Sequence, residues 1–339
     1  MKAFAIKDKG LVAEIEVAEP VMTSTDVLID VHYIGLCGSD LNSFRGLMPL
    51  VTLPRIPGHE ISGKVIAKGD NVPSSIQIGD SVTVSPYTNC GTCPACRAGR
   101  VNTCEFNQTL GVQREGALTE RISVPFDKVF VSKTLSLHEL ALVEPMSVGY
   151  HGANRGQVCE TDTVLLLGCG TIGMGALVAA VRKGARVIAL DIDDSKLEQA
   201  KKFGAAETIN SLKVDALATI MQLTQNEGVS VAIEAAGNQA TYKLALDAVC
   251  FAGRIVFIGY PKKEVSFEAP LLVRKEVNMY GSRNALRVFP SVITMFEKKE
   301  FPFTDMITKI FPFAQTADAF KFWDENTGKV SKILIELKK

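Results

Sequence analysis

The stretch "TVLLLGCGTIG", from Thr163 to Gly173, decides the fold of the second half of this chain. It begins with an apolar run that is typical of a buried strand, and its glycines follow a G-x-G-x-x-G pattern at Gly168, Gly170 and Gly173. A second predicted strand, "RVIALD", ends at Asp191. A strand, a glycine turn, a helix and a further strand ending in an acidic residue together predict a unit that binds a dinucleotide.

Each part of this pattern has an expected role. The first glycine makes the tight turn, the second lets the backbone approach the pyrophosphate, and the third packs helix against strand. Thr171 and Ile172 open the helix whose free N–H groups would receive the phosphates, and Lys196 on the next helix completes the predicted cofactor-binding set. Asp191 would accept hydrogen bonds from a ribose 2′-OH and repel a 2′-phosphate, which favours NAD over NADP. The alternative is a glycine turn in a non-binding α/β domain.

The length of the chain predicts two domains, because 339 residues are too many for one ordinary hydrophobic core. Strands alternate with helices from Thr163 to Gly281, which predicts a doubly wound parallel sheet. The first part is β-rich, and its segment "DVLIDVHYIG" alternates apolar and polar residues as a half-buried strand does. The tail contains two helix-like segments, "FPSVITMFEKK" and "AQTADAFKFW", and a last strand, "KILIEL". On pattern alone the tail could belong to either domain.

The charge balance excludes a strong bulk attraction to nucleic acid or to an anionic membrane. Lys plus Arg and Asp plus Glu number 37 each. The first residues lack the apolar region of a signal peptide, because Lys7, Asp8 and Lys9 interrupt it. We therefore expect a cytoplasmic protein, in which clustered cysteines are metal ligands rather than disulfides.

The run "CGTCPACRAGRVNTC", residues 90–104, holds four of the eight cysteines in a C-x2-C-x2-C-x7-C pattern. An iron–sulfur ferredoxin run would place its fourth cysteine after three residues and follow it with proline, whereas here seven residues intervene and Glu105 follows. A closed four-thiolate zinc site is the better physical match. The isolated cysteines are expected to be small buried hydrophobes: Cys159, Cys169 and Cys250.

A second group of metal ligands is less conspicuous. The segments "GLCGSD" and "PGHEISG" supply Cys37, His59 and Glu60, which are residue types that zinc accepts, and glycines flank both segments. On spacing alone, a metal site and a purely structural role are equal alternatives for these residues.

Three segments resemble a known family. "GHEISGKVIAKGDNV", residues 58–72, matches the zinc signature G-H-E-x2-G-x5-G-x2-V, and "CGSD", residues 37–40, matches the loop with the first zinc ligand. "LVEPMSVGYHGANRG", residues 142–156, is similar to the polyol branch. Over its whole length the chain resembles the zinc-dependent alcohol dehydrogenases of the medium-chain dehydrogenase/reductase family, in the branch exemplified by sorbitol dehydrogenase.

This resemblance implies a fold of the α/β class with two domains. Residues 1–147 and 287–339 would form a GroES-like, zinc-containing catalytic domain, and residues 148–286 a Rossmann domain that binds NAD. It also implies a homodimer or a homotetramer.

The resemblance further implies the roles of individual residues. Cys37 and His59 would be catalytic zinc ligands, and Glu60 a ligand or an exchangeable near-ligand. Glu144 would bind zinc directly or hold the zinc water, and Ser39 would hydrogen-bond the alcohol and start a proton relay. A structural zinc would make two zinc ions per chain, with these ligands: Cys90, Cys93, Cys96 and Cys104.

The implied reaction oxidises a secondary alcohol to a ketone, with zinc as Lewis acid and NAD as hydride acceptor. The usual polyol pattern is C-G-S-D-x-H, but this chain reads "CGSDLN", with Asn42 in place of the titratable histidine. Arg283, in "KEVNMYGSRNALRVFP", falls where polyol enzymes place an arginine in the substrate pocket. The "GSRNA" segment resembles bacterial relatives that oxidise sugar acids such as L-galactonate or L-gulonate. The alternatives are a zinc-independent reductase of the same superfamily and a zinc-ribbon protein that binds nucleic acid.

Overall fold

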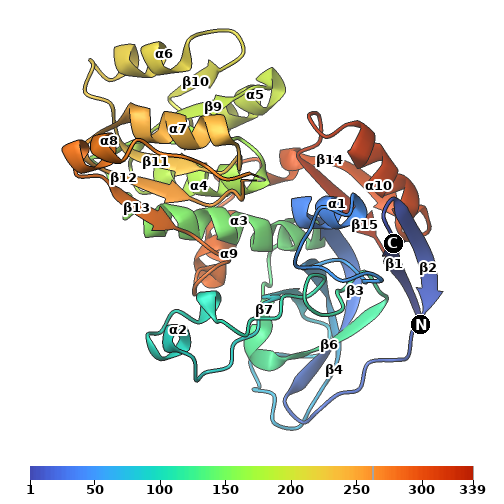
Figure 1. Cartoon of the computed structure of the whole chain (residues 1–339). Helices are drawn as coiled ribbons and strands as arrows, with labels where there is room; N and C mark the ends of the chain where they lie inside the picture. The colour runs from blue at the N-terminus through green and yellow to red at the C-terminus, as the bar shows by residue number, and fades with distance from the viewer. Residues whose placement is uncertain (262, 339) are drawn as a thin grey trace. The chain divides into compact units, whose positions relative to one another are not determined.

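The computed structural model describes residues 1–261 and 263–338, and the chain divides into two compact units. Unit 1 comprises Met1–Glu144 and Phe289–Lys339, and unit 2 comprises Pro145–Val288. The boundary falls within helix α3 (Leu137–Arg155). None of the helices in the described ranges is both long and apolar enough to cross a membrane. The mixture of a β-rich unit and a parallel-sheet unit confirms the predicted α/β class (Figure 1).

Unit 1 is built on a seven-stranded sheet with the order β14-β15-β3-β4-β5-β7, and β6 also pairs with β3. Its central strand is β3 (Asp26–Leu36), whose first residues alternate between buried and half-buried as the sequence predicts. The tail joins this sheet, because β15 (Lys332–Glu336) pairs with β3 antiparallel. The other strands are β1 (Lys2–Asp8), β2 (Leu11–Glu16), β4 (Glu60–Lys68), β5 (Ser81–Val84), β6 (Arg121–Pro125), β7 (Val129–Val131) and β14 (Ile307–Pro312).

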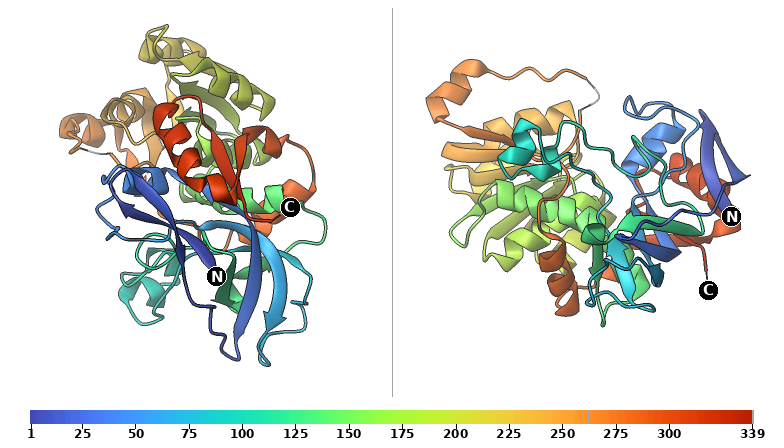
Figure 2. Two further views of the ribbon diagram at one scale, coloured as in Figure 1. Left: turned by 90° about the vertical axis from the view of Figure 1, so that its right-hand side faces the viewer. Right: turned by 90° about the horizontal axis from the view of Figure 1, so that it is seen from below.

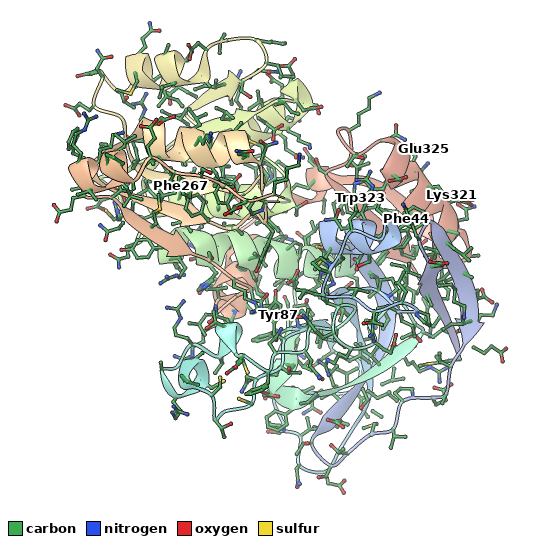
Figure 3. The ribbon with its side chains drawn as sticks, viewed as in Figure 1. Phe44, Tyr87, Phe267, Lys321, Trp323 and Glu325 are labelled. Carbon is green, nitrogen blue, oxygen red and sulfur yellow. The ribbon has the colours of Figure 1, made fainter. Side chains whose placement is uncertain are left out.

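The core of unit 1 lies between this sheet, the β1–β2 hairpin and the C-terminal helix. Phe44 and Trp323 both lie in it (Figure 3), and the ring of Phe44 packs against that of Phe320. Its helices and 3-10 turns are α1 (Gly38–Phe44), α2 (Pro94–Arg97), α9 (Phe289–Glu297), α10 (Thr316–Glu325), η1 (Val101–Thr103), η2 (Phe126–Lys128), η3 (Phe303–Met306) and η4 (Phe313–Gln315).

Unit 2 is a six-stranded parallel sheet with the order β10-β9-β8-β11-β12-β13 and helices on both faces (Figure 2). Numbered from its first strand, this order is 3-2-1-4-5-6, the doubly wound arrangement of dinucleotide-binding domains. Ligands bind such sheets at the carboxyl ends of the strands where the order reverses, here between β8 and β11. The elements are β8 (Thr163–Leu167), α4 (Thr171–Arg182), β9 (Arg186–Asp191), α5 (Asp194–Lys202), β10 (Glu207–Asn210), α6 (Ala216–Leu223), β11 (Val229–Glu234), α7 (Gln239–Ala248), β12 (Val249–Phe257), α8 (Ala269–Lys275) and β13 (Asn278–Gly281).

Candidate functional site

The pairing of β3 with β4 brings the candidate metal ligands of unit 1 together. Gly35 on β3 lies opposite Glu60 on β4, so Cys37, just after β3, lies near His59, just before Glu60. One ligand atom from each of Cys37, His59 and Glu60 falls within 4.8 Å of the others. His59 and Glu60 are buried and Cys37 is half-buried. A sulfur, an imidazole nitrogen and a carboxylate oxygen this close together form a donor set that suits zinc.

The turn after β3 holds Cys37 at the N-terminus of α1. The backbone N–H of Cys37 donates to Asp40 Oδ2 at 2.9 Å, which caps the helix from inside. Asp40 is buried, and its Oδ1 lies 3.9 Å from His59 Nδ1. A carboxylate behind a ligating imidazole is a common device for fixing its tautomer and orientation. Burial alone would lower the pKa of His59, but the negative charges of Asp40 and Cys37 outweigh it and raise that pKa well above the ordinary value.

Glu60 forms a buried ion pair with Lys332, the first residue of β15. Both carboxylate oxygens accept from Lys332 Nζ at 2.6 Å, and the same amine donates to the carbonyl of Leu36 at 3.0 Å. Glu60 fits here because Gly35 has no side chain: a Cβ at Gly35 would lie 2.1 Å from Glu60 Oε2. Burial raises the pKa of Glu60 to about 7, although Lys332 opposes the rise. Burial would lower the pKa of Lys332, but the charges of Glu60 and Cys37 raise it.

Glu144, on α3, lies beside this group rather than within it. It is buried, and one of its oxygens, Oε1, accepts a hydrogen bond from the hydroxyl of Tyr87. Burial raises the pKa of Glu144, while the charge of His59 and the Tyr87 hydroxyl oppose the rise. For Tyr87, burial and the Glu144 charge both raise the pKa, and Cys37 and Glu60 add to it, so the phenol is a donor. Glu144 is therefore held at the edge of the candidate metal site.

Two further polar atoms fit a site that receives a group from outside the chain. Within the described part of the chain, Ser39 Oγ and His59 Nδ1 are buried and lack a hydrogen-bond partner. Buried polar groups are usually paired, so such atoms require an explanation. For Ser39, a substrate hydroxyl is a suitable partner. Asn42, the residue that departs from the polyol pattern, lies half-buried on α1.

The four cysteines of the second cluster converge around α2 and the turn η1. Their sulfur atoms all lie within 4.8 Å of one another, and two of the pairs, Cys90–Cys96 and Cys93–Cys104, are 4.0 Å apart. A tetrahedral site with Zn–S bonds of about 2.3 Å requires S···S distances of about 3.8 Å, so the cluster fits zinc. Hydrogen bonds from the Thr92 hydroxyl and from the N–H groups of Cys93 and Thr92 lower the pKa of Cys90 to about 6, which favours the thiolate.

The three glycines of unit 2 occupy three different environments. Gly168 has a φ of +99°, and a Cβ there would lie 2.9 Å from the backbone nitrogen of Ala236. Gly170 is the N-cap of α4, and a Cβ there would meet no protein atom within 4 Å. A Cβ at Gly173 would lie 1.9 Å from the carbonyl oxygen of Gly168. The first and third glycines are therefore required by the fold, whereas the open space at Gly170 suits a bound pyrophosphate.

Asp191, at the end of β9, fastens the glycine turn. Its Oδ2 accepts from the N–H of Cys169 at 2.7 Å, and its Oδ1 accepts from those of Ile192 and Asp193 at 2.7 and 3.1 Å. Because Oδ2 accepts only one of these bonds, it has a second lone pair available for a ribose hydroxyl. Lys196 lies in the first turn of α5, where its N–H donates to Asp193.

The remaining predicted positions are more scattered. Thr171 and Ile172 form the first turn of α4 as expected, and Arg283 lies half-buried in unit 2, two residues after β13. Of the isolated cysteines, Cys169 is buried and Cys250 is half-buried. The prediction that Cys159 is buried is wrong: it is exposed, because it lies in the turn before β8, where its N–H donates to Asp162.

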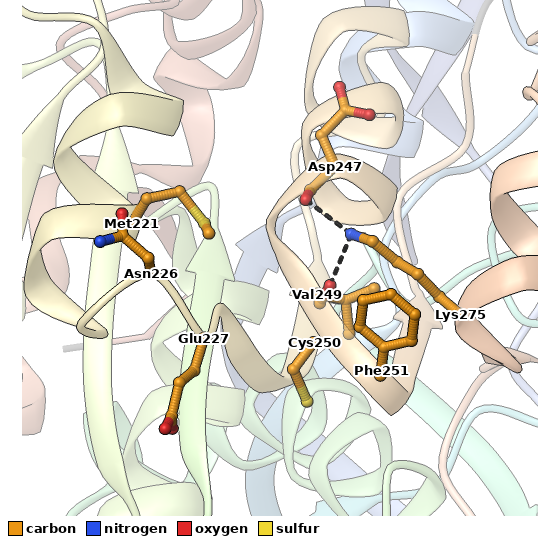
Figure 4. A pocket seen from close by; sticks show the side chains of 8 residues that line it. All are labelled: Met221, Asn226, Glu227, Asp247, Val249, Cys250, Phe251 and Lys275. Carbon is orange, nitrogen blue, oxygen red and sulfur yellow. Dashed lines mark hydrogen bonds between the residues drawn. The ribbon is translucent and has the colours of Figure 1, made fainter.

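A cavity of about 380 Å³ in unit 2 is separate from these sites (Figure 4). Its lining includes Val249 and Cys250 at the start of β12, so it lies at the amino ends of the strands, opposite the glycine turn. Lys275 is directed inward to the end of α7, where its amine donates to the carbonyls of Leu246, Asp247 and Val249. The amine therefore serves as a cap for that helix.

Sequence reasoning did not find Lys332 and Tyr87. A lysine at the start of an otherwise apolar strand, "KILIEL", is a signal for a buried ion pair, but nothing local indicates its partner. Tyr87 lies three residues before Cys90 and reads as an ordinary strand-end tyrosine.

Comparisons with known proteins show which family this chain resembles in sequence. Residues 23–134 match the model of the alcohol dehydrogenase GroES-like domain, and residues 171–298 match that of the zinc-binding dehydrogenases. The chain is 35% identical to sorbitol dehydrogenase of Bacillus subtilis over 89% of its length and 87% of that protein. It is 31% identical to L-galactonate-5-dehydrogenase of Escherichia coli, over 89% of both chains.

Two of the solved structures that are similar to this chain contain a nicotinamide cofactor. One is an Escherichia coli alcohol dehydrogenase, rspB, complexed with NADH (TM-score 0.91, 28% identity, 99% of both chains). The other is a zinc-binding dehydrogenase from Sinorhizobium meliloti bound to NADP (TM-score 0.90, 28% identity, 99% of both chains).

Proposed function

The chain belongs to the zinc-binding alcohol dehydrogenase family, and from that premise we propose that it oxidises a secondary alcohol of a polyol or sugar acid with NAD. The reaction balances as alcohol plus NAD⁺ giving ketone, NADH and a proton. The observation that carries the proposal is the group formed by Cys37, His59 and Glu60, whose ligand atoms lie within 4.8 Å of one another. A zinc-independent reductase would have no use for this buried donor set.

In the proposed site Cys37, His59 and Glu60 hold a zinc ion, with Glu144 as a ligand or as the holder of a water molecule. When bound, zinc supplies the Lewis acidity that lowers the pKa of an alcohol oxygen. Asp40 places a carboxylate 3.9 Å from Nδ1 of His59, and Lys332 balances the charge of Glu60. Cys37 supplies the thiolate ligand of the proposed site.

Ser39 is the proposed first acceptor of the alcohol proton. Its Oγ is buried and, among the described residues, has no hydrogen-bond partner of its own. Asn42 can pass a hydrogen bond but cannot titrate near neutral pH, so the relay continues from Ser39 through water rather than through a histidine.

For the cofactor we propose NAD rather than NADP. The support comes from Asp191, because a carboxylate that can accept from a ribose 2′-OH would repel a 2′-phosphate. The relatives include one solved with NADH and one with NADP, so this assignment rests on the residue itself. Gly170 and the first turn of α4 would receive the pyrophosphate.

For the substrate we propose a polyol or a sugar acid such as L-galactonate or L-gulonate. The named relatives include a sorbitol and an L-galactonate dehydrogenase. Arg283 is the candidate partner for a carboxylate, since its guanidinium can bind one through two parallel hydrogen bonds. A homodimer or homotetramer with two zinc ions per chain completes the proposal.

The test is a screen of NAD reduction over polyols and sugar acids. The wild-type chain should form NADH with at least one secondary alcohol, and the Cys37→Ser variant should not. Metal analysis should find two zinc ions per chain, and one in a Cys96→Ser variant. NAD reduction that survives both a chelator and Cys37→Ser would overturn the proposal in favour of a zinc-independent reductase.

A further inference from the structure

Tyr87 lies at a junction between the candidate catalytic site and the four-cysteine lobe, residues 90–104. It is buried in unit 1 (Figure 3), and its hydroxyl donates to Glu144 Oε1. Three residues further along the chain, Cys90 begins the lobe. The family resemblance assigns no role to Tyr87, and the proposed mechanism does not use it.

The backbone on both sides of Tyr87 is fastened to the segment that leaves the lobe. Before it, the carbonyl of Pro86 accepts from the N–H of Leu110 at 3.1 Å. After it, Thr88 makes two bonds: its N–H donates to Asn107 Oδ1 at 3.2 Å, and its Oγ1 accepts from the N–H of Gln108 at 2.6 Å.

This segment is itself tied to the last cysteine of the lobe. The N–H of Asn107 donates to the carbonyl of Cys104 at 3.2 Å, and Asn107 Nδ2 donates to Thr109 Oγ1 at 2.9 Å. A continuous set of hydrogen bonds therefore runs from Cys104 to the residue that follows Tyr87. These bonds hold the backbone on both sides of Tyr87, and the hydroxyl of its ring donates to Glu144.

The hydrogen bond from Tyr87 restricts the orientation of the Glu144 side chain. It is a buried carboxylate beside the group formed by Cys37, His59 and Glu60, and a free carboxylate there could turn toward a metal. The Tyr87 hydroxyl occupies one of its oxygens. A hydrogen bond to a charged group is stronger than a neutral one, so the contact favours one rotamer of Glu144.

We propose that Tyr87 is a positioning residue, which links the four-cysteine lobe to Glu144 and keeps that carboxylate oriented beside the catalytic metal instead of free to join its ligands. The lobe would then serve the reaction as well as stability. The inference rests on the proposed metal site, whose failure would be visible separately as a wild-type chain that binds no metal at Cys37.

The first experiment compares Tyr87→Phe with the matched control Tyr33→Phe, with cobalt(II) replacing zinc. Tyr33 is also a buried tyrosine of unit 1 whose hydroxyl donates to a carboxylate, Glu336 Oε1, at 2.7 Å. The visible absorption of cobalt depends on the number and arrangement of its ligands. Because Tyr87→Phe and Tyr33→Phe replace no cysteine of the lobe, the difference spectrum between them is assigned to the other metal.

We expect Tyr87→Phe to change the cobalt spectrum and to lower kcat by about tenfold, with an unchanged KM for NAD. Tyr33→Phe should change neither quantity. If the two variants match in spectrum and kcat, Tyr87 is a structural residue and the proposal is overturned.

The second experiment tests the link to the lobe with Thr88→Val. This change keeps the phenol and the shape of residue 88 but removes the acceptor for the N–H of Gln108. We expect a spectral change in the same direction and a kcat lower by about fivefold. A Thr88→Val variant identical to wild type would refute the link, and this variant carries the test alone should Tyr87→Phe fail to fold.

Discussion

Replacing Lys332 by methionine should destabilise unit 1 far more than replacing a lysine on its surface. Methionine matches the length of lysine without its charge, so the change removes the ion pair and leaves the space filled. Glu60 then remains buried, and both of its oxygens lose the donor that now lies at 2.6 Å. The carbonyl of Leu36 loses its donor as well.

The magnitude follows from the burial of the pair. Glu60 is 0% exposed and Lys332 3%, so water replaces neither lost contact. Gly35 lies against Glu60 Oε2, which prevents the carboxylate from moving toward β3. Removing one partner of a buried pair costs about 3–5 kcal/mol, a large share of an ordinary stability of about 5–15 kcal/mol.

The chain offers a natural probe for this measurement. Its single tryptophan, Trp323, is buried in unit 1, so tryptophan fluorescence, excited selectively over the tyrosines, reports on that unit in urea. With a slope near 3 kcal/mol per molar urea, the loss corresponds to a midpoint lower by about 1–1.7 M. A chelator should be present throughout, because a bound metal adds its own stabilisation.

The matched control is Lys338→Met. Lys338 pairs with Asp30 at 2.6 Å in the same unit, but its side chain is 40% exposed, so we expect a loss of at most about 1 kcal/mol. A double variant, Lys332→Met with Glu60→Gln, should recover most of the stability because no unpaired charge remains. Equal midpoints for Lys332→Met and Lys338→Met would refute the reasoning.

Three further predictions concern unit 2. Gly170→Ala should fold normally but bind NAD more weakly, which calorimetry of NAD binding would measure. Gly173→Ala should lose about 1–3 kcal/mol of stability in urea unfolding, because its Cβ would lie 1.9 Å from a carbonyl oxygen. Asp191→Ser should raise the NADP-to-NAD ratio of kcat/KM by about tenfold, and an unchanged ratio would contradict the ribose assignment. Burial opposes ionisation of Asp162, but hydrogen bonds from Cys159 and Ser230, together with a nearby arginine, lower its pKa. The ionised carboxylate of Asp162 therefore stabilises the fold above its ordinary pKa of 3.8, and this stabilisation is lost as the pH falls through the lower folded-state pKa. In urea unfolding followed by circular dichroism, the stabilities of wild type and Asp162→Asn should differ at neutral pH and converge below pH 3.8.

Much of the fold was predictable because its signals are local. The glycine pattern around Gly168, the alternation along β3 and the rhythm of strands and helices in unit 2 each lie within short windows of sequence. The parallel, doubly wound sheet of unit 2 was predictable from its alternation of strands and helices, whereas its strand order was read from the structure. The place of the tail was not predictable in this way, because its membership depends on β15 pairing with β3, some three hundred residues earlier.

The residues of the candidate site also fall into two groups, those recognisable from local sequence and those brought in by tertiary packing. By itself, the sequence determined the residue types that can bind metal and dinucleotide, because Cys37, His59 and the glycine turn each stand in a recognisable local motif. Only the tertiary structure decided what surrounds them. Lys332 and Glu60 are 272 residues apart in the chain, and Tyr87 and Glu144 are 57 apart. A buried charge or hydroxyl must find a partner, but which one it finds depends on how sheets and helices pack, and no short window of sequence contains that information.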